Sequence, residues 1–186
     1  VDASTGVVTA LTDGVDEYAG TWSADGTQIA FRVDSGRAAP GIWVKDLSLG
    51  LSSGYTQITA TDANQPYSSK YPSWRPATPF TPTTVDGITY TRDGSIWYLD
   101  NGTPVQLTDA TAQDGTPAWS PDRTTIAFHS DSRGTSTTVA LWTVDVATGA
   151  LTQISDDGGA DFTPAWSPDG SQIVFASDGR AALKSL

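Results

Sequence analysis

The sequence contains no cysteine, no methionine and a single histidine. Without cysteine the chain has no disulfide, no thiolate nucleophile and no cysteine-ligated zinc site, so its fold does not depend on the redox compartment. His129 has no second histidine with which to form a two-histidine metal motif. Lys and Arg number only 10 against 21 acidic residues, which gives a net charge of −11. Because no basic excess is available to neutralise phosphates, we expect no nucleic-acid partner.

Long hydrophobic runs are also absent. No stretch approaches the roughly 18 apolar residues of a membrane-spanning helix, so no membrane insertion is expected. No basic and then apolar amino-terminal stretch indicates a signal peptide. A start at Val1 with no methionine in the chain indicates a processed mature protein or an excised segment. Glu17 is the one glutamate among 21 acidic residues, and because aspartate prefers turns, this composition argues against a helical protein.

What the sequence does contain is a repeat centred on tryptophan. Trp119 and Trp166 both lie in Pro-Ala-Trp-Ser-Pro-Asp, Trp22 lies in the similar Thr-Trp-Ser-Ala-Asp, and Trp74 marks a degenerate fourth copy. The steps between these tryptophans are 52, 45 and 47 residues. Such a period is typical of a propeller blade, which has four strands and about 40–50 residues.

Each copy continues with the same strands and turns. Seven residues after the tryptophan comes a short alternating run, such as Ile126-Ala127-Phe128, which is typical of a half-buried strand. A second run contains its own tryptophan and ends in aspartate, and a third run closes the copy. The Ser-Pro-Asp-Gly sequence has the residues of a tight turn between the innermost strand and the next. The tryptophan before it is expected to pack between adjacent blades.

These features predict an all-β fold, a β-propeller of four four-stranded antiparallel blades in a single domain. The ends of the chain match one strand of the repeat in phase, and joining them would make the last tryptophan step 42 residues. We therefore expect the amino-terminal strand, residues 7–12, to pair with the carboxyl-terminal blade and close the ring. A four-blade fragment of a larger propeller and an eight-bladed ring of two chains stay open as alternatives. The expected blades are residues 13–59, 60–108, 109–155, and 156–186 completed by 1–12 of the domain 1–186.

The third copy, residues 107–145, preserves the repeat best. Its order is Leu-Thr, Pro-Ala-Trp-Ser-Pro-Asp, Ile-Ala-Phe and Leu-Trp-x-x-Asp. In this order the chain resembles the WD40-like (PD40) repeat of TolB-type β-propellers, over nearly its whole length. The resemblance implies a secreted or periplasmic propeller that serves as a binding scaffold. The same repeats occur in propeller domains attached to peptidases and in some polysaccharide lyases, so the resemblance alone does not decide the chemistry.

Few residues could support catalysis. His129 is the only candidate general base, and no Gly-x-Ser-x-Gly nucleophile elbow accompanies it. Paired carboxylates of a glycosidase stay open because aspartate is abundant. Asp25, Asp122 and Asp169, however, fall at turn positions, where hydrogen bonds to turn amides explain them. We expect no catalytic residue, although an enzymatic activity stays open.

Acidic residues recur just before the innermost strands. By propeller geometry these loops lie at one end of the central channel, where several carboxylates could face one another. Like charges that close need a cation or water between them, and oxygen-only ligands favour Ca²⁺. We therefore consider an axial cation held by Asp16, Asp114 and Asp161, with the alternative that they cap turns or face solvent. No other cofactor is expected.

Aromatic residues around the second copy complete the candidate site. Tyr67 and Tyr71 are not required by the repeat and favour a recognition role there. The predicted ligand-binding set is Tyr67, Tyr71, Asp16, Asp114, Asp161 and His129. The predicted function is a non-catalytic, secreted or periplasmic scaffold, monomeric, that binds a protein or peptide partner through loops at one end of the channel. The alternative is a carbohydrate-active module, either a lectin or a polysaccharide-degrading enzyme.

Overall fold

The computed structural model describes most of the chain, and the described part is built from β-strands joined by turns. The described residues are 10–13, 16–35, 39–59, 69–75, 87–131, 133, 138–155, 159–178 and 180–185, with the backbone alone at 19 and 180–185. In these residues no helix is long and apolar enough to cross a membrane.

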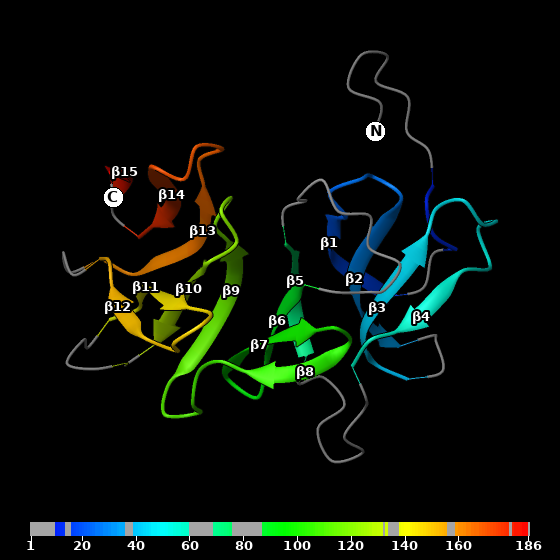
Figure 1. Ribbon diagram of the computed structural model, residues 1–186, viewed down its shortest axis with the longest axis horizontal. Helices are drawn as coiled ribbons and strands as arrows, with labels where there is room; N and C mark the ends of the chain where they lie inside the picture. Colours follow the sequence, from blue (N-terminus) through cyan, green and yellow to red (C-terminus); the bar gives the residue numbers. More distant parts are fainter. Residues whose placement is uncertain are drawn as a thin grey trace.

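The strands form antiparallel sheets that follow one another along the chain (Figure 1). The first sheet contains β1 (Asp16–Trp22), β2 (Gln28–Ser35), β3 (Gly41–Asp46) and β4 (Tyr55–Gln57). The second contains β5 (Ser69–Trp74), β6 (Ile88–Arg92), β7 (Ser95–Asp100) and β8 (Thr103–Gln106). The third contains β9 (Gln113–Trp119), β10 (Thr125–Asp131), β11 (Ala140–Asp145) and β12 (Leu151–Gln153). The fourth contains β13 (Asp161–Trp166), β14 (Gln172–Ser177) and β15 (Arg180–Ser185). The predicted all-β fold of antiparallel sheets is confirmed.

The first strand of each later sheet packs against the preceding sheet. β5 contacts β1, β2 and β3, β9 contacts β5, β6 and β7, and β13 contacts β9, β10 and β11. The first strands are thus neighbours of one another, and we call β1, β5, β9 and β13 the inner edge of the molecule (Figure 1). Residues that are far apart in the sequence meet along this edge.

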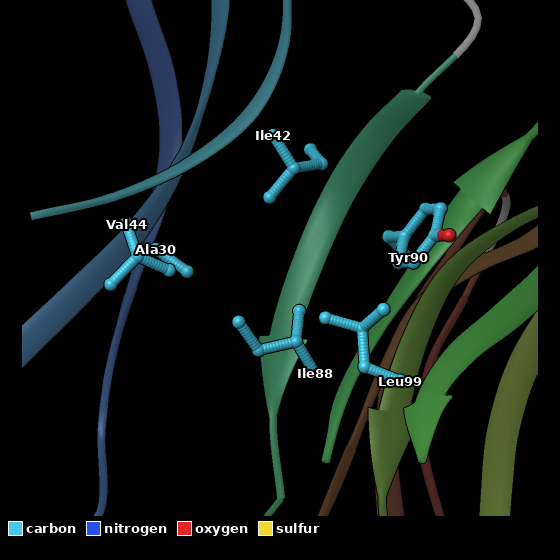
Figure 2. Close-up of a cluster of buried hydrophobic side chains, with 6 residues drawn as sticks. All are labelled: Ala30, Ile42, Val44, Ile88, Tyr90 and Leu99. Carbon is cyan, nitrogen blue, oxygen red and sulfur yellow. The ribbon is translucent and has the colours of Figure 1, made fainter. Parts of the chain in front are cut away.

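Tryptophans of the repeat fill the spaces between sheets. Trp74 packs on a buried cluster that joins the first and second sheets, whose side chains Figure 2 shows. Trp119 is only 5% exposed between the second and third sheets. Trp166 packs between the third and fourth, and its Nε1–H donates to the carbonyl oxygen of Ala118 at 3.1 Å. The predicted blade-to-blade role is confirmed for these three residues.

Trp22 departs from that prediction. It occupies the equivalent position in the first sheet but is 55% exposed. The physical reason is that, within the described residues, β1 is the first strand and no other sheet packs over Trp22. Trp22 as a core residue is therefore wrong for this structure.

The predicted closure of the ring is not seen. Where the chain is described, sheets contact only their neighbours in sequence, and none of β13–β15 contacts β1–β4. These two end sheets lie at opposite ends of the longest axis (Figure 1). Of the expected closing strand, residues 7–9 lie outside the described residues, and residues 10–12 form no strand. The fourth sheet accordingly has three described strands.

Serine and aspartate side chains stabilise the turns that follow the inner strands. Ser23 Oγ donates to Asp25 Oδ1 at 2.6 Å, and the amide of Gln28 donates to Ser23 Oγ at 2.9 Å. Asp122 and Asp169 accept the same serine bond at 2.5 and 2.6 Å. These bonds lower the pKa of all three carboxyl groups, that of Asp169 to about 2. The interpretation of these aspartates as turn residues is confirmed.

Candidate binding surface on the inner edge

Every strand of the inner edge is interrupted by a β-bulge, visible as a register shift two to four residues before its tryptophan. In three of them a residue other than glycine has a positive φ: Tyr71 (53°), Thr116 (46°) and Thr163 (51°). Each lies three residues before the tryptophan of its strand. Bulky and β-branched residues rarely adopt this conformation, and such strain concentrates at functional sites. The bulges therefore make the inner edge the strongest candidate for a functional site.

The bulges bring aromatic and hydroxyl side chains onto adjacent strands. Tyr71 and Thr163 are exposed, and Thr116 is half-buried. His129 on β10 lies beside Thr116, and Phe162 on β13 lies beside His129. We call these five residues, Tyr71, Thr116, His129, Phe162 and Thr163, the inner-edge surface.

His129 is the residue that links two sheets within this surface. Its Nδ1 lies 2.7 Å from Thr116 Oγ1. Its ring meets the ring of Phe162, from the fourth sheet, edge to face with 5.5 Å between centroids. The imidazole also lies over Gly115, where a Cβ atom would come within 2.5 Å of its Cε1. Close packing around the ring therefore requires glycine at position 115.

The protonation state of His129 determines which hydrogen bonds its imidazole can make. Burial lowers the pKa of His129, and the charges of Asp114 and Asp131 offset only part of that effect. The imidazole is therefore neutral at pH 7 and offers one donor and one acceptor. Its Nδ1 meets a threonine hydroxyl, whereas a hydrolytic triad would place a carboxylate there. This arrangement suits the recognition of a ligand better than acyl transfer.

Behind the surface, Asp114 is held in a buried ion pair. Its carboxylate accepts a hydrogen bond from Ser130 Oγ at 2.5 Å, and Arg133 Nη2 donates to its Oδ2 at 2.7 Å. Arg133 Nη1 also donates to Asp109 Oδ1 at 3.1 Å. The guanidinium thus ties the loop before β9 to the start of that strand. Asp114 serves here as an anchor for the inner edge, with its charge already neutralised.

The predicted cation ligands occupy equivalent places without meeting. Asp16, Asp114 and Asp161 each pair in register with a serine of the second strand of their own sheet. Asp16 accepts a hydrogen bond from its serine, Ser35. Asp161 is buried, with no hydrogen-bond partner at Oδ1 within the described part of the chain. No three acidic or histidine side chains of that part gather as a metal site would require. The axial Ca²⁺ stays a prediction.

The other predicted site residues divide into two groups. Tyr67 lies outside the described residues, whereas Tyr71 and His129 both lie on the inner-edge surface. Thr116, Phe162 and Thr163 were missed by sequence reasoning. The signal that could have found them is their fixed distance of three or four residues before the repeat tryptophan.

No family model and no curated protein sequence matches the chain. Among solved structures, it is similar to TolB from Agrobacterium tumefaciens, with 24% identity and a TM-score of 0.66 over 86% of this chain and 53% of that one. It is similar to TolB from Acinetobacter baumannii, with 20% identity and a TM-score of 0.67 over 91% and 41%. It is also similar to a puromycin-hydrolyzing peptidase of Mycobacterium tuberculosis, with 15% identity and a TM-score of 0.69 over 97% and 29%.

The chain thus spans about half, or less, of the proteins that it matches. At these identities the similarity speaks for the fold alone. Together with the stacked antiparallel sheets, it confirms what the repeats predict: this chain has the fold of a TolB-like β-propeller.

Proposed function

We propose that this chain is a non-catalytic scaffold that binds a protein or peptide partner on the inner-edge surface. The observation that carries the proposal is the repeated positive φ of Tyr71, Thr116 and Thr163 on adjacent strands. Backbone strain of this kind persists only where the surrounding structure imposes it. Three copies in one register indicate a surface that the fold maintains.

The chemistry of the surface suits an extended peptide. Tyr71 and Phe162 offer flat apolar area at a small cost in conformational entropy, as tyrosine does in antibody binding sites. The hydroxyls of Thr116 and Thr163 offer donors and acceptors for peptide groups. A ligand of this kind would lie along the inner edge and contact several sheets.

The location we propose is extracytoplasmic, secreted or periplasmic. The support is the resemblance of the repeats to those of TolB-type propellers and the similarity in fold to two TolB structures. The peptidase among the similar structures shows that the fold also occurs in an enzyme. The proposal therefore rests on the chemistry of the inner-edge surface and not on the similarity in fold.

A paired screen tests the proposal. The wild-type chain is panned against a displayed peptide library and applied to a glycan array. We expect selected peptides to bind, and Phe162→Ala and Tyr71→Ala each to weaken them by about 10-fold, as loss of an aromatic anchor does. The matched control is Leu151→Ala, because Leu151 is exposed on β12, an outer strand.

The outcomes of the screen distinguish the peptide-binding scaffold from the carbohydrate-active module. Peptides that bind both aromatic variants as tightly as the wild type would place the site elsewhere and overturn the proposal. Binding confined to the glycan array, and lost in Tyr71→Ala, would favour the carbohydrate-active module. No binding to either library would also count against a scaffold of this kind.

A further inference from the structure

The inner strand of the second sheet differs from the other inner strands in charge. Near its start, each of the other three strands has an aspartate that pairs in register with a serine: Asp16, Asp114 and Asp161. In the second sheet Ser69 takes the place of the aspartate and pairs with Arg92. The charge at this register therefore changes from negative to positive in the second sheet, although the net charge of the chain is −11.

Lys70, the next residue of β5, adds a second positive charge. It is half-buried and pairs in register with Thr91 of β6. Its ammonium group has no ion pair and no hydrogen bond within the described residues. A half-buried ammonium group of this kind has lost part of its hydration without a bond that compensates for it. It is therefore well placed to bind an anion.

The hydroxyl group of Thr91 lacks a partner as well. Thr91 is 6% exposed, and its Oγ1 makes no hydrogen bond within the described residues. A buried hydroxyl without a bond destabilises the folded state, so natural proteins rarely retain one without a reason. Residues that pair directly in an antiparallel sheet have side chains on the same face, with Cβ atoms about 4.5–5.5 Å apart. The ammonium group of Lys70 and the hydroxyl of Thr91 can therefore reach the same ligand.

Two other sheets satisfy their polar groups at this register internally. In the first sheet Arg32 takes the place of Thr91, and its guanidinium donates to both carboxylate oxygens of Asp34, at 2.5 and 2.7 Å. In the third sheet His129 takes that place, and its Nδ1 lies 2.7 Å from the hydroxyl of Thr116. Of these three sheets, the second is the one whose polar groups at this register stay unpaired within the described residues.

Arg92 is the other cation of this region, and it is already engaged. It follows Thr91 directly in β6, so its side chain lies on the opposite face of the strand. Its guanidinium lies 5.5 Å from the centre of the Trp97 ring, and its Nε lies 3.5 Å from Asp93 Oδ2. Lys70 is therefore the cation available to a ligand at this sheet.

We propose that Lys70 and Thr91 form a subsite for a carboxylate group of the bound peptide. The inference rests on the proposed function, because it names the chemistry of the peptide that the inner-edge surface would bind. Lys70 directly precedes Tyr71 of that surface, so a peptide on the surface can place a carboxylate at the subsite. The ammonium group donates a charge-assisted hydrogen bond to the carboxylate, and the hydroxyl donates a second. Because the hydroxyl is covered in the unliganded protein, we expect the flexible lysine stem to turn as the carboxylate enters.

Short peptides that differ in their carboxylate test the subsite. The backbone amide signals of the isotope-labelled wild type are followed by NMR during titration with each of three probes. Acetyl-triglycine has a free chain end, its amide has no carboxylate, and acetyl-glutamyl-glycine amide has a carboxylate in its side chain. We expect a carboxylate probe to shift the signals of Lys70 and Thr91, and the neutral amide to leave them in place. The carboxylate probe that binds more tightly identifies the source as a chain end or an acidic side chain.

Variants separate a binding role from a structural one. Lys70→Met keeps the apolar stem and removes the charge, so it should weaken carboxylate binding about 10-fold, the effect of losing one hydrogen bond to a charged group. Thr91→Val removes the unpaired hydroxyl, so it should weaken binding while the melting temperature stays unchanged or rises. The matched control is Arg32→Met, which removes a cation that Asp34 already pairs and should bind the probes like the wild type.

Failure of the subsite is distinguishable from failure of the scaffold. If the carboxylate probes shift neither signal, or if Lys70→Met binds them as tightly as the wild type, the subsite is overturned whatever the peptide screen finds. Selected peptides that lose binding in Phe162→Ala but show no preference for a carboxylate would also overturn the subsite, and the scaffold would stand. Binding of the carboxylate probes without any selected peptide would support the anion site and count against the scaffold.

Discussion

Replacing Arg133 with methionine is expected to destabilise the protein strongly, because it leaves the carboxylate of Asp114 buried without its cation. The side chain of Asp114 is 0% exposed and that of Arg133 is 8% exposed, and Nη2 and Oδ2 are 2.7 Å apart. Methionine keeps most of the apolar volume of the arginine stem, so the change removes chiefly the charge and its hydrogen bonds.

The magnitude follows from burial. Removing one partner of a buried ion pair costs about 3–5 kcal/mol. Ser130 still donates to Asp114 in the variant, which places the expected loss near the lower end, about 3 kcal/mol. Losing the second bond of Arg133, to Asp109, adds little to the loss of stability, because the Asp109 side chain is 65% exposed. With a urea dependence of about 1–3 kcal/mol per molar, the unfolding midpoint should fall by about 1–3 M.

Urea unfolding followed by tryptophan fluorescence measures this loss. The matched control is Arg32→Met, which breaks the pair of Arg32 and Asp34, whose side chains are 20% and 26% exposed. That pair should contribute about 0–1 kcal/mol. Adding Asp114→Asn to Arg133→Met removes the orphaned charge and should restore part of the stability. If Arg133→Met cost no more than Arg32→Met, the reasoning that Asp114 is desolvated would be refuted.

Three further predictions concern the same region. Gly115→Ala should lower the free energy of unfolding by about 1–3 kcal/mol, because the new methyl group displaces the imidazole of His129. In a double-mutant cycle, adding His129→Ala should remove most of that loss. Additive losses would contradict the close packing of the imidazole on Gly115. Stability should fall as the pH drops below 6.5, because burial lowers the pKa of His129 and the unfolded chain takes up the proton first. Stability should fall again below pH 3.8, as aspartates such as Asp169, with a pKa of about 2, become protonated. Urea titrations at a series of pH values measure both losses of stability. The variant His129→Gln should abolish only the first loss. Because Arg133 already neutralises Asp114, we expect calcium and a chelator each to leave the melting temperature unchanged, and a calcium-induced rise would instead support the predicted axial cation.

The strands and turns could be predicted because their causes are local. Trp119 and Trp166 stand at a fixed distance before Ser-Pro-Asp, and that tripeptide makes the same turn wherever it occurs. The alternating run that follows, Ile126-Ala127-Phe128, places its apolar side chains on both faces because both are covered by sheets. Spacing along the chain therefore determined the sheet order and the antiparallel pairing.

The bulges could not be predicted because they arise from how the inner strands pack. Nothing in the identity of Thr116 or Thr163 indicates a positive φ, which threonine normally avoids. The role of Asp114 was hidden for a related reason. Arg133 lies 19 residues further along the chain, and only the folded sheet brings its guanidinium to the carboxylate. From the sequence alone, the recurrence of aspartates suggested a cation, and nothing in it indicated that Arg133 pairs with Asp114.

The tryptophans show most clearly where sequence periodicity stops being sufficient. Trp22 and Trp119 occupy the same place in the repeat, yet one is 55% exposed and the other 5%. Burial of such a side chain is a property of two sheets, and the sequence of one repeat specifies only the half that it contributes. Because a fully buried tryptophan removes about 150–250 Å² of surface from water, the free energy that a repeat tryptophan contributes depends strongly on whether a neighbouring sheet covers it.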